Sequence, residues 1–154
     1  AMLMTQIMYK KVDLTMALNG AIAGLVSITA GPDLTNHLMS IIIGGFGGVL
    51  VVIAIPLLDR LKIDDVVGAI SAHLVAGIWG TLAVGIFGAG DIMVQIIGIL
   101  AIGVFVVVTS SIVWLVLKYT VGIRANEEDE DMGLDSAELG LEAYPEFGRG
   151  SQRA

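Results

Sequence analysis

The chain has 154 residues, no cysteine and a hydrophobic content of 56%. Its mean hydropathy of +0.88 is too high for an ordinary soluble domain, where about 45–50% of residues are apolar, and the lack of cysteine excludes disulfides, thiolate metal sites and cysteine nucleophiles. The net charge of −7 is uneven, because residues 119–154 contain nine of the 15 acidic and three of the eight basic residues, and no basic face for nucleic acid is expected.

Residues 1–12 are predicted to be the end of an upstream helix. The segment from Ala1 to Tyr9 is apolar but too short to cross a bilayer, which takes roughly 20 helical residues. It could lie at the membrane interface, or it could be the cytoplasmic end of a further span that is cut short. We expect the chain to be a fragment, a truncated product or one part of a split protein.

Residues 13–118 are predicted to be a membrane domain of four helices, at about 14–30, 38–58, 66–87 and 92–117. The first is the shortest and contains Asn19. The second contains Pro56 near its end, where a helix tolerates proline better than at its centre. The last is long enough to tilt in a bilayer or to project from it. The sequence therefore predicts an all-α membrane protein.

Residues 119–154 are predicted to be an acidic tail. Residues 127–131 are five consecutive acidic residues, a pattern that is typically solvated and often serves as an interaction tail. The apolar residues that follow would give this segment something to bury; they are Leu134, Leu139, Leu141, Tyr144 and Phe147. We expect the tail to dock on the membrane domain or on a partner.

The basic residues predict the orientation. They lie before the first span, between the second and third, and after the fourth: Lys10, Lys11, Arg60, Lys62, Lys118 and Arg124. The other two connections contain no lysine or arginine. The positive-inside rule then predicts that both ends of the chain are cytoplasmic.

His73 is the residue with the strongest functional signal. It lies in the third predicted span, where no charged side chain occurs between Asp65 and Asp91. An ionisable ring at membrane depth is costly and usually faces a pore, a cavity or a partner group. By α-helical spacing it shares a face with Gly77 and Gly80, while Trp79 points away.

Three interpretations of His73 remain open on the residues alone. It could be a pore histidine that hydrogen-bonds a small polar substrate or relays its proton. It could be a haem ligand, although His37, the other histidine, is predicted in a surface loop. It could be a structural histidine bonded to a neighbouring helix. No hydrolase, kinase or nucleotide-binding pattern is present, so no enzyme, cofactor or metal site is predicted.

Other residues have mainly structural interpretations. Asp64 and Asp65 precede the third span and are predicted to cap it, because aspartate accepts hydrogen bonds from the unpaired N–H groups of a helix start. Small residues recur at four-residue spacing in the first three spans, and such faces let helix backbones pack closely; they include Gly20, Gly24, Gly44, Gly48, Ala72, Ala76 and Gly80.

Three segments together resemble the C-terminal part of the ammonium transporter (Amt/Mep/Rh) family. They are DLTMALNGAIAGLVSITAG (13–31), IDDVVGAISAHLVAGIWGTLAVGIFG (63–88) and VGIRANEEDEDMGLDSAELGLEAYPEF (121–147). The resemblance implies the last four of eleven spans in an inverted-repeat transporter fold, a homotrimer in the cell membrane, and a cytoplasmic C-terminus. A PII-type regulatory protein is implied as a possible partner at the cytoplasmic face.

The resemblance also implies roles for individual residues. His73 matches the second of two paired pore histidines, Ile22 and Ala69 would line the inner side of the pore, and Thr29 would lie nearer its outer end. Asp64 and Asp65 match an acidic pair at the start of the tenth span. The chain departs from the family at Val66, where proline is common, and at Leu139, where histidine commonly precedes the glycine.

The implied function is ammonium or ammonia transport. The alternative is a non-transporting regulatory or structural membrane subunit that acts through its cytoplasmic tail.

Overall fold

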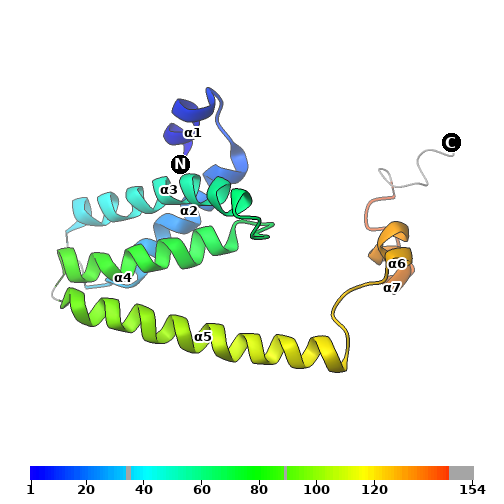
Figure 1. The fold of residues 1–154 in the computed structure, drawn as a ribbon. Helices are drawn as coiled ribbons and strands as arrows, with labels where there is room; N and C mark the ends of the chain where they lie inside the picture. Colours follow the sequence, from blue (N-terminus) through cyan, green and yellow to red (C-terminus); the bar gives the residue numbers. More distant parts are fainter. Residues whose placement is uncertain (34–35, 89, 146–154) are drawn as a thin grey trace. The chain divides into compact units, whose positions relative to one another are not determined.

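The computed structural model describes residues 1–33, 36–88 and 90–145, and the regular structure of these residues is helical (Figure 1). This confirms the all-α prediction for the described part of the chain. The elements are α1 (Met2–Tyr9), α2 (Leu14–Thr29), α3 (His37–Arg60), the π-helix η1 (Ile70–Val75), α4 (Ala76–Phe87), α5 (Ile92–Thr120), α6 (Glu127–Met132) and α7 (Leu134–Leu139).

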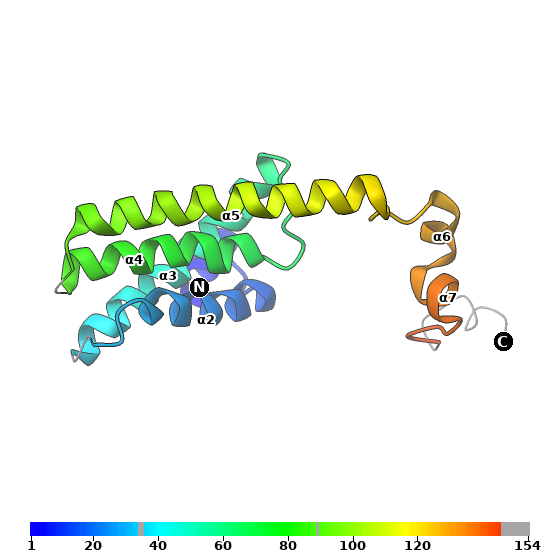
Figure 2. The same ribbon diagram turned by 90° about the horizontal axis from the view of Figure 1, so that it is seen from below.

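The chain divides into two units, residues 1–105 and the residues from 106 onward, and α5 crosses the boundary. In the first unit, α2, α3 and α4 pack against one another, and they lie side by side in both views (Figure 2). The buried apolar cluster of this unit is small, and its members come from α2, α3, η1 and the first residue of α4: Ala23, Val51, Val52, Ala72 and Ala76.

Three helices in the described part of the chain are long and apolar enough to cross a membrane by length and composition. They are His37–Arg60 with 24 residues, Ile70–Phe87 with 18 and Ile92–Thr120 with 29. The first of the four predicted spans corresponds to α2, which is apolar but has only 16 residues, fewer than the roughly 20 that usually cross a bilayer. The count of four spans therefore remains a prediction.

Short polar side chains begin the apolar helices. The carboxylate of Asp13 accepts a hydrogen bond from the Met16 amide at 2.8 Å, and Asp91 accepts one from the Met93 amide at 2.7 Å. The side-chain oxygen of Asn36 accepts from the Leu38 amide at 3.1 Å. These bonds satisfy N–H groups that have no partner inside the helix. His37, predicted in a loop, is instead the first residue of α3, and its side chain is exposed.

Glycines set the distance between α2, α3 and α4. A Cβ atom added to Gly24 would lie 3.3 Å from the carbonyl oxygen of Gly44, and the reverse substitution would meet Gly24 at the same distance. A Cβ atom on Gly80 would lie 2.5 Å from the carbonyl oxygen of Ser27. The small-residue faces are therefore packing faces, where backbone meets backbone.

The acidic block of the tail forms a short helix, α6. The Asn126 side chain caps it by accepting a hydrogen bond from the Asp129 amide at 2.9 Å. The negative side chains of its first turn face the positive end of the helix dipole, which favours them there. Arg124 and Glu130 form an ion pair at 3.2 Å, but both side chains are exposed, so the pair contributes little stability.

The apolar residues of the tail are exposed within the described part of the chain. Leu134, Leu139, Leu141 and Tyr144 all lie on the surface, and Phe147 lies outside the described residues. The carboxylate of Asp135 accepts hydrogen bonds from the Ala143 and Ser136 amides, at 2.8 and 2.9 Å. These bonds lower the pKa of Asp135. The expected docking of the tail on another surface remains a prediction.

Candidate functional site

His73 lies in the π-helix η1, directly before α4. A π-helix closes hydrogen bonds between residues i and i+5 and is rare; most examples are single turns within α-helices, often at functional sites. The His73 side chain is exposed, whereas Ser71 and Ala72 beside it are buried against the helices of the first unit. The sequence signal for His73 thus coincides with an unusual backbone, which sequence spacing alone did not predict.

The residues predicted to share a face with His73 differ from it in exposure. Uniform α-helical spacing would place His73, Gly77 and Gly80 on one face, but His73 is exposed, Gly77 is half-buried and Gly80 is buried. The reason is that η1 holds more residues per turn than an α-helix, so the angular positions of residues before Ala76 shift relative to those after it. Gly77 and Gly80 lie against Val26 and Ser27 of α2, so the small residues of α4 pack on that helix.

Asp65 holds the start of η1 through three hydrogen bonds. Its Oδ1 accepts from the Ile70 amide at 3.0 Å, and its Oδ2 accepts from both the amide and the hydroxyl of Ser71, each at 3.1 Å. Partial burial raises the pKa of this carboxyl, but the hydrogen bonds to its charged form outweigh that effect and hold the pKa below its ordinary value. The neighbouring Asp64 is exposed.

Gly68 lies in the turn that connects Asp65 with the start of η1. Its φ of +72° is a left-handed conformation that residues with a Cβ rarely adopt. It is also buried, and a Cβ there would lie 2.9 Å from Nδ2 of Asn19 on α2. Asn19, the polar residue noted in the first predicted span, is itself buried. The turn and the polar residue of α2 are therefore packed together.

The other predicted pore residues also lie on the exposed surface of the first unit. Ile22 and Thr29 belong to an exposed stripe of α2 that faces away from the buried residues of that helix. The Thr29 hydroxyl donates to the Leu25 carbonyl at 2.7 Å. Ala69 is exposed and immediately precedes η1. The roles of these residues remain predictions.

Sequence reasoning missed the polar contacts that join the helices. Nε1 of Trp79 donates to the carbonyl oxygen of Ile43 on α3 at 3.0 Å, and its ring lies 4.5 Å from that of Phe46, centroid to centroid. The buried hydroxyl of Ser27 lies 3.4 Å from the carbonyl oxygen of Ala76 on α4, to which it donates, and it also donates to the Ala23 carbonyl of its own helix at 2.7 Å. The sequence carries a signal for such contacts: a tryptophan and a serine in apolar spans have donor groups that need acceptors when they are buried.

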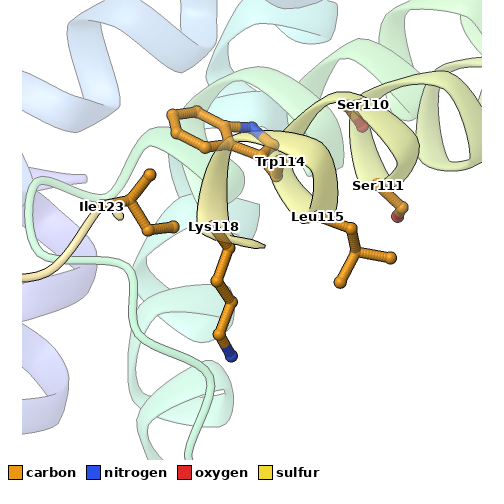
Figure 3. Close-up of a pocket in the computed structure, with 6 residues that line it drawn as sticks. All are labelled: Ser110, Ser111, Trp114, Leu115, Lys118 and Ile123. Atoms are coloured by element: carbon orange, nitrogen blue, oxygen red, sulfur yellow. The ribbon is translucent and has the colours of Figure 1, made fainter. Parts of the chain in front are cut away.

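A separate groove of about 340 Å³ lies in the second unit, along the last turns of α5 (Figure 3). It contains none of the predicted pore residues; its lining is Ser110, Ser111, Trp114, Leu115, Lys118 and Ile123. The Ser110 hydroxyl donates to the carbonyl of Val106 in its own helix. We place the candidate site at η1, where the backbone is specialised, and not in this groove.

Comparison with known proteins identifies the family. The model of the Ammonium Transporter Family matches residues 1–144. This chain belongs to the ammonium transporter family. The family is one of transporters and not of enzymes, and its membership together with the long apolar helices makes this chain part of an integral membrane protein.

Three archaeal relatives illustrate the similarity. Ammonium transporter Amt1 of Haloferax mediterranei is 38% identical over 135 residues, which cover 84% of this chain and 26% of the relative. Ammonium transporter Amt2 of Archaeoglobus fulgidus is 34% identical over 168 residues, 96% of this chain and 36% of the relative. Ammonium transporter Amt2 of Methanocaldococcus jannaschii is 37% identical over 147 residues, which cover 87% of this chain and 34% of the relative. The chain thus spans about a quarter to a third of the length of these ammonium transporters.

Proposed function

We propose that this chain is the C-terminal part of an ammonium transporter subunit, and that His73 is one of its two paired pore histidines. The observation that carries the proposal is the position of His73 in a member of this family: an exposed imidazole on a π-helix, within an apolar segment long enough to span a membrane. Such a ring is costly in lipid, and a pore gives it a polar partner.

Imidazole has the chemistry that this role requires. The neutral ring donates a hydrogen bond from one nitrogen and accepts one at the other. It can therefore hold ammonia by hydrogen bonds in an otherwise apolar path, and imidazole is a common relay for a mobile proton.

The proposal assigns Ile22, Ala69 and Thr29 to the wall of the same pore. Their exposure on the first unit is compatible with this role, because an exposed apolar surface of this kind is usually covered by another element or by lipid. The opposite wall, with the first pore histidine, would come from the part of the subunit that matches the rest of the relatives' length. Asp65 is assigned to the start of the third span, and neither Asp64 nor Asp65 is assigned to the pore.

The proposed topology has four spans, with both ends of the chain in the cytoplasm of a multi-pass cell-membrane protein. It is supported by the basic residues, which all lie on one side in this arrangement. The 16 residues of α2 would extend about 24 Å at 1.5 Å per residue, so neighbouring residues would have to complete that span. A homotrimer of such subunits, regulated at its cytoplasmic face by a PII-type protein, completes the proposal.

Transport by the product of the complete gene tests the proposed function. We expect proteoliposomes that contain this protein to accumulate methylammonium and to give an ammonium-evoked current, compared with empty liposomes. The alternative, a regulatory subunit that acts through its tail, predicts no flux from this protein alone and retained binding to an ammonium transporter or to a PII-type protein. A protein that gives neither uptake nor current would reject the transport proposal.

A further inference from the structure

The π-helix at His73 raises the question of what fixes its register. An extra residue in a helical turn could in principle be placed at other positions along the same helix, and each placement would turn His73 in a different direction. A shift of one residue in an α-helix corresponds to a rotation of about 100°. The structure shows one placement, with η1 confined to Ile70–Val75.

We propose that Asp65 and Ser71 form a clamp that fixes the register of η1 and thereby the direction in which His73 projects. Asp65 is then a positioning residue that acts through the backbone and does not touch the substrate. This inference rests on the proposed function of His73, because the direction of the ring matters only if the ring faces a substrate path.

The geometry of the clamp favours a single register. Both carboxylate oxygens of Asp65 are used, and they engage two successive amides of η1 and the Ser71 hydroxyl. Ser71 is fully buried, so its side chain has few other places to go. A slip by one residue would pull the hydroxyl from its acceptor and would leave a buried donor unpaired, which is costly.

The clamp is also anchored to α2 through Gly68. Gly68 lies between the two members of the clamp, and its amide donates to the Asp65 carbonyl at 2.9 Å, while its carbonyl accepts from the Ala72 amide at 2.8 Å. Gly68 also packs against buried Asn19 of α2. The carboxylate, the turn and the first π-helical residues therefore form one connected unit that is fixed to α2.

Asp64 provides a matched control. It has the same side chain one residue earlier but is exposed, and the hydrogen bonds to Ile70 and Ser71 belong to Asp65. Asp65→Asn keeps the size of the side chain and replaces one acceptor oxygen by an NH₂ donor, which would face a donor of Ile70 or Ser71. Asp64→Asn makes the same change in charge without altering the clamp.

The test is a double-mutant cycle between Asp65 and His73 in the product of the complete gene. The readout is the ratio of ammonium-evoked current to methylammonium uptake, at equal amounts of inserted protein. We expect Asp65→Asn to change this ratio by about threefold or more, as for residues coupled through one network, and Asp64→Asn to leave it unchanged. In a protein that already contains His73→Ala, Asp65→Asn should cause no further change in the ratio of current to uptake.

Two results would overturn the clamp. The first is a ratio for Asp65→Asn equal to that of the unmodified protein, and the second is an Asp65→Asn effect of the same size with and without His73. If His73→Ala itself leaves flux and ratio unchanged, the proposed function fails; if His73→Ala alters them and Asp65→Asn does not, only the clamp fails.

Ser71→Ala keeps the test decisive if Asp65→Asn prevents insertion of the protein. This variant removes one hydrogen bond of the clamp and leaves both amide bonds to Asp65 in place. We expect it to insert normally and to shift the ratio in the direction of His73→Ala, by about twofold. An unshifted ratio, or a failure of Ser71→Ala to insert, would contradict a positioning role, since the pair would then serve folding alone.

Discussion

Trp79 and Ile43 are joined by a hydrogen bond from the indole Nε1 to the carbonyl oxygen, 3.0 Å long, that ties α4 to α3. The indole ring also stacks at a tilt on Phe46, with centroids 4.5 Å apart. The helix α4, which directly follows the π-helix of His73, is thus fixed to its neighbours by a directional contact at Trp79 as well as by the packing of Gly80 near Ser27.

Replacing Trp79 by phenylalanine is expected to destabilise the protein by about 1 kcal/mol, the usual net contribution of one hydrogen bond. Ring contact with Phe46 would be largely retained. Trp114 is the matched control, because it lies exposed on α5, and Trp114→Phe should change stability by less than about 0.5 kcal/mol. Unfolding in mixed micelles, followed by circular dichroism, measures both; equal losses for the two variants would contradict the role given to Trp79.

Alanine substitutions at two glycines of α3 should have opposite effects. A Cβ at Gly47 would lie 2.8 Å from the Ala23 carbonyl oxygen and would also strike the Ser27 side chain, so Gly47→Ala should cost about 1–3 kcal/mol. At Gly45 no atom lies within 4 Å of an added Cβ, so Gly45→Ala should be neutral or stabilising by up to about 1 kcal/mol. Thermal melting of both variants in the same detergent provides the comparison. A stable Gly47→Ala protein would show that α2 and α3 are not in contact there.

Gly68 should be more sensitive to alanine than Gly122. Both have a positive φ, +72° and +82°, and both should lose about 1–2 kcal/mol for that reason. A Cβ atom added to Gly68 would lie 2.9 Å from Nδ2 of Asn19, whereas one added to Gly122 would have no neighbour within 4 Å. The difference in melting temperature between Gly68→Ala and Gly122→Ala therefore isolates the steric contribution, and identical shifts would exclude one.

The contribution of Asp65 to stability should depend on pH. Its pKa is lowered in the folded protein, so the unfolded chain binds the proton more readily, and the stabilisation is lost as pH falls. The advantage of the unmodified protein over Asp65→Asn should be complete at neutral pH and should persist down to the ordinary carboxyl value of 3.8. It should shrink below that value, as pH passes through the lowered folded pKa.

Unfolding of the two proteins across this acid range provides the measurement. Asp135, whose pKa is also lowered, is present in both and cancels from the difference. A constant difference at all pH values would show that the Asp65 charge is not what the hydrogen bonds stabilise.

Much of the helical organisation could be predicted from the sequence, because apolar length is a strong signal. The predicted spans 38–58 and 92–117 correspond to His37–Arg60 and Ile92–Thr120; the last span begins at the predicted residue, and the other three ends are displaced by one to three residues. Helix ends are the least certain part of any such prediction, since caps decide them. The capping roles of Asp13, Asn36 and Asp91 explain where α2, α3 and α5 begin.

The local geometry around His73 could not be predicted in the same way. Periodicity arguments assume 3.6 residues per turn, and a π-helix breaks that assumption without a distinctive residue type. The bond from Asp65 to Ser71 spans six residues across a glycine turn, a distance for which helix-capping rules have no pattern. His73 could therefore be singled out from the sequence as a candidate, while its π-helical backbone and the exposure of its ring could not be predicted from periodicity.

The most direct test of the central claim is the transport phenotype of His73→Ala in the product of the complete gene. Methylammonium uptake and ammonium-evoked current are measured side by side, with Leu74→Ala, an exposed neighbour in the same π-helix, as the control. A pore role for His73 predicts that His73→Ala changes the rate of one or both, or the selectivity between the two ions, while Leu74→Ala changes neither. Unchanged uptake, current and selectivity in His73→Ala would contradict the assignment of His73 to the pore.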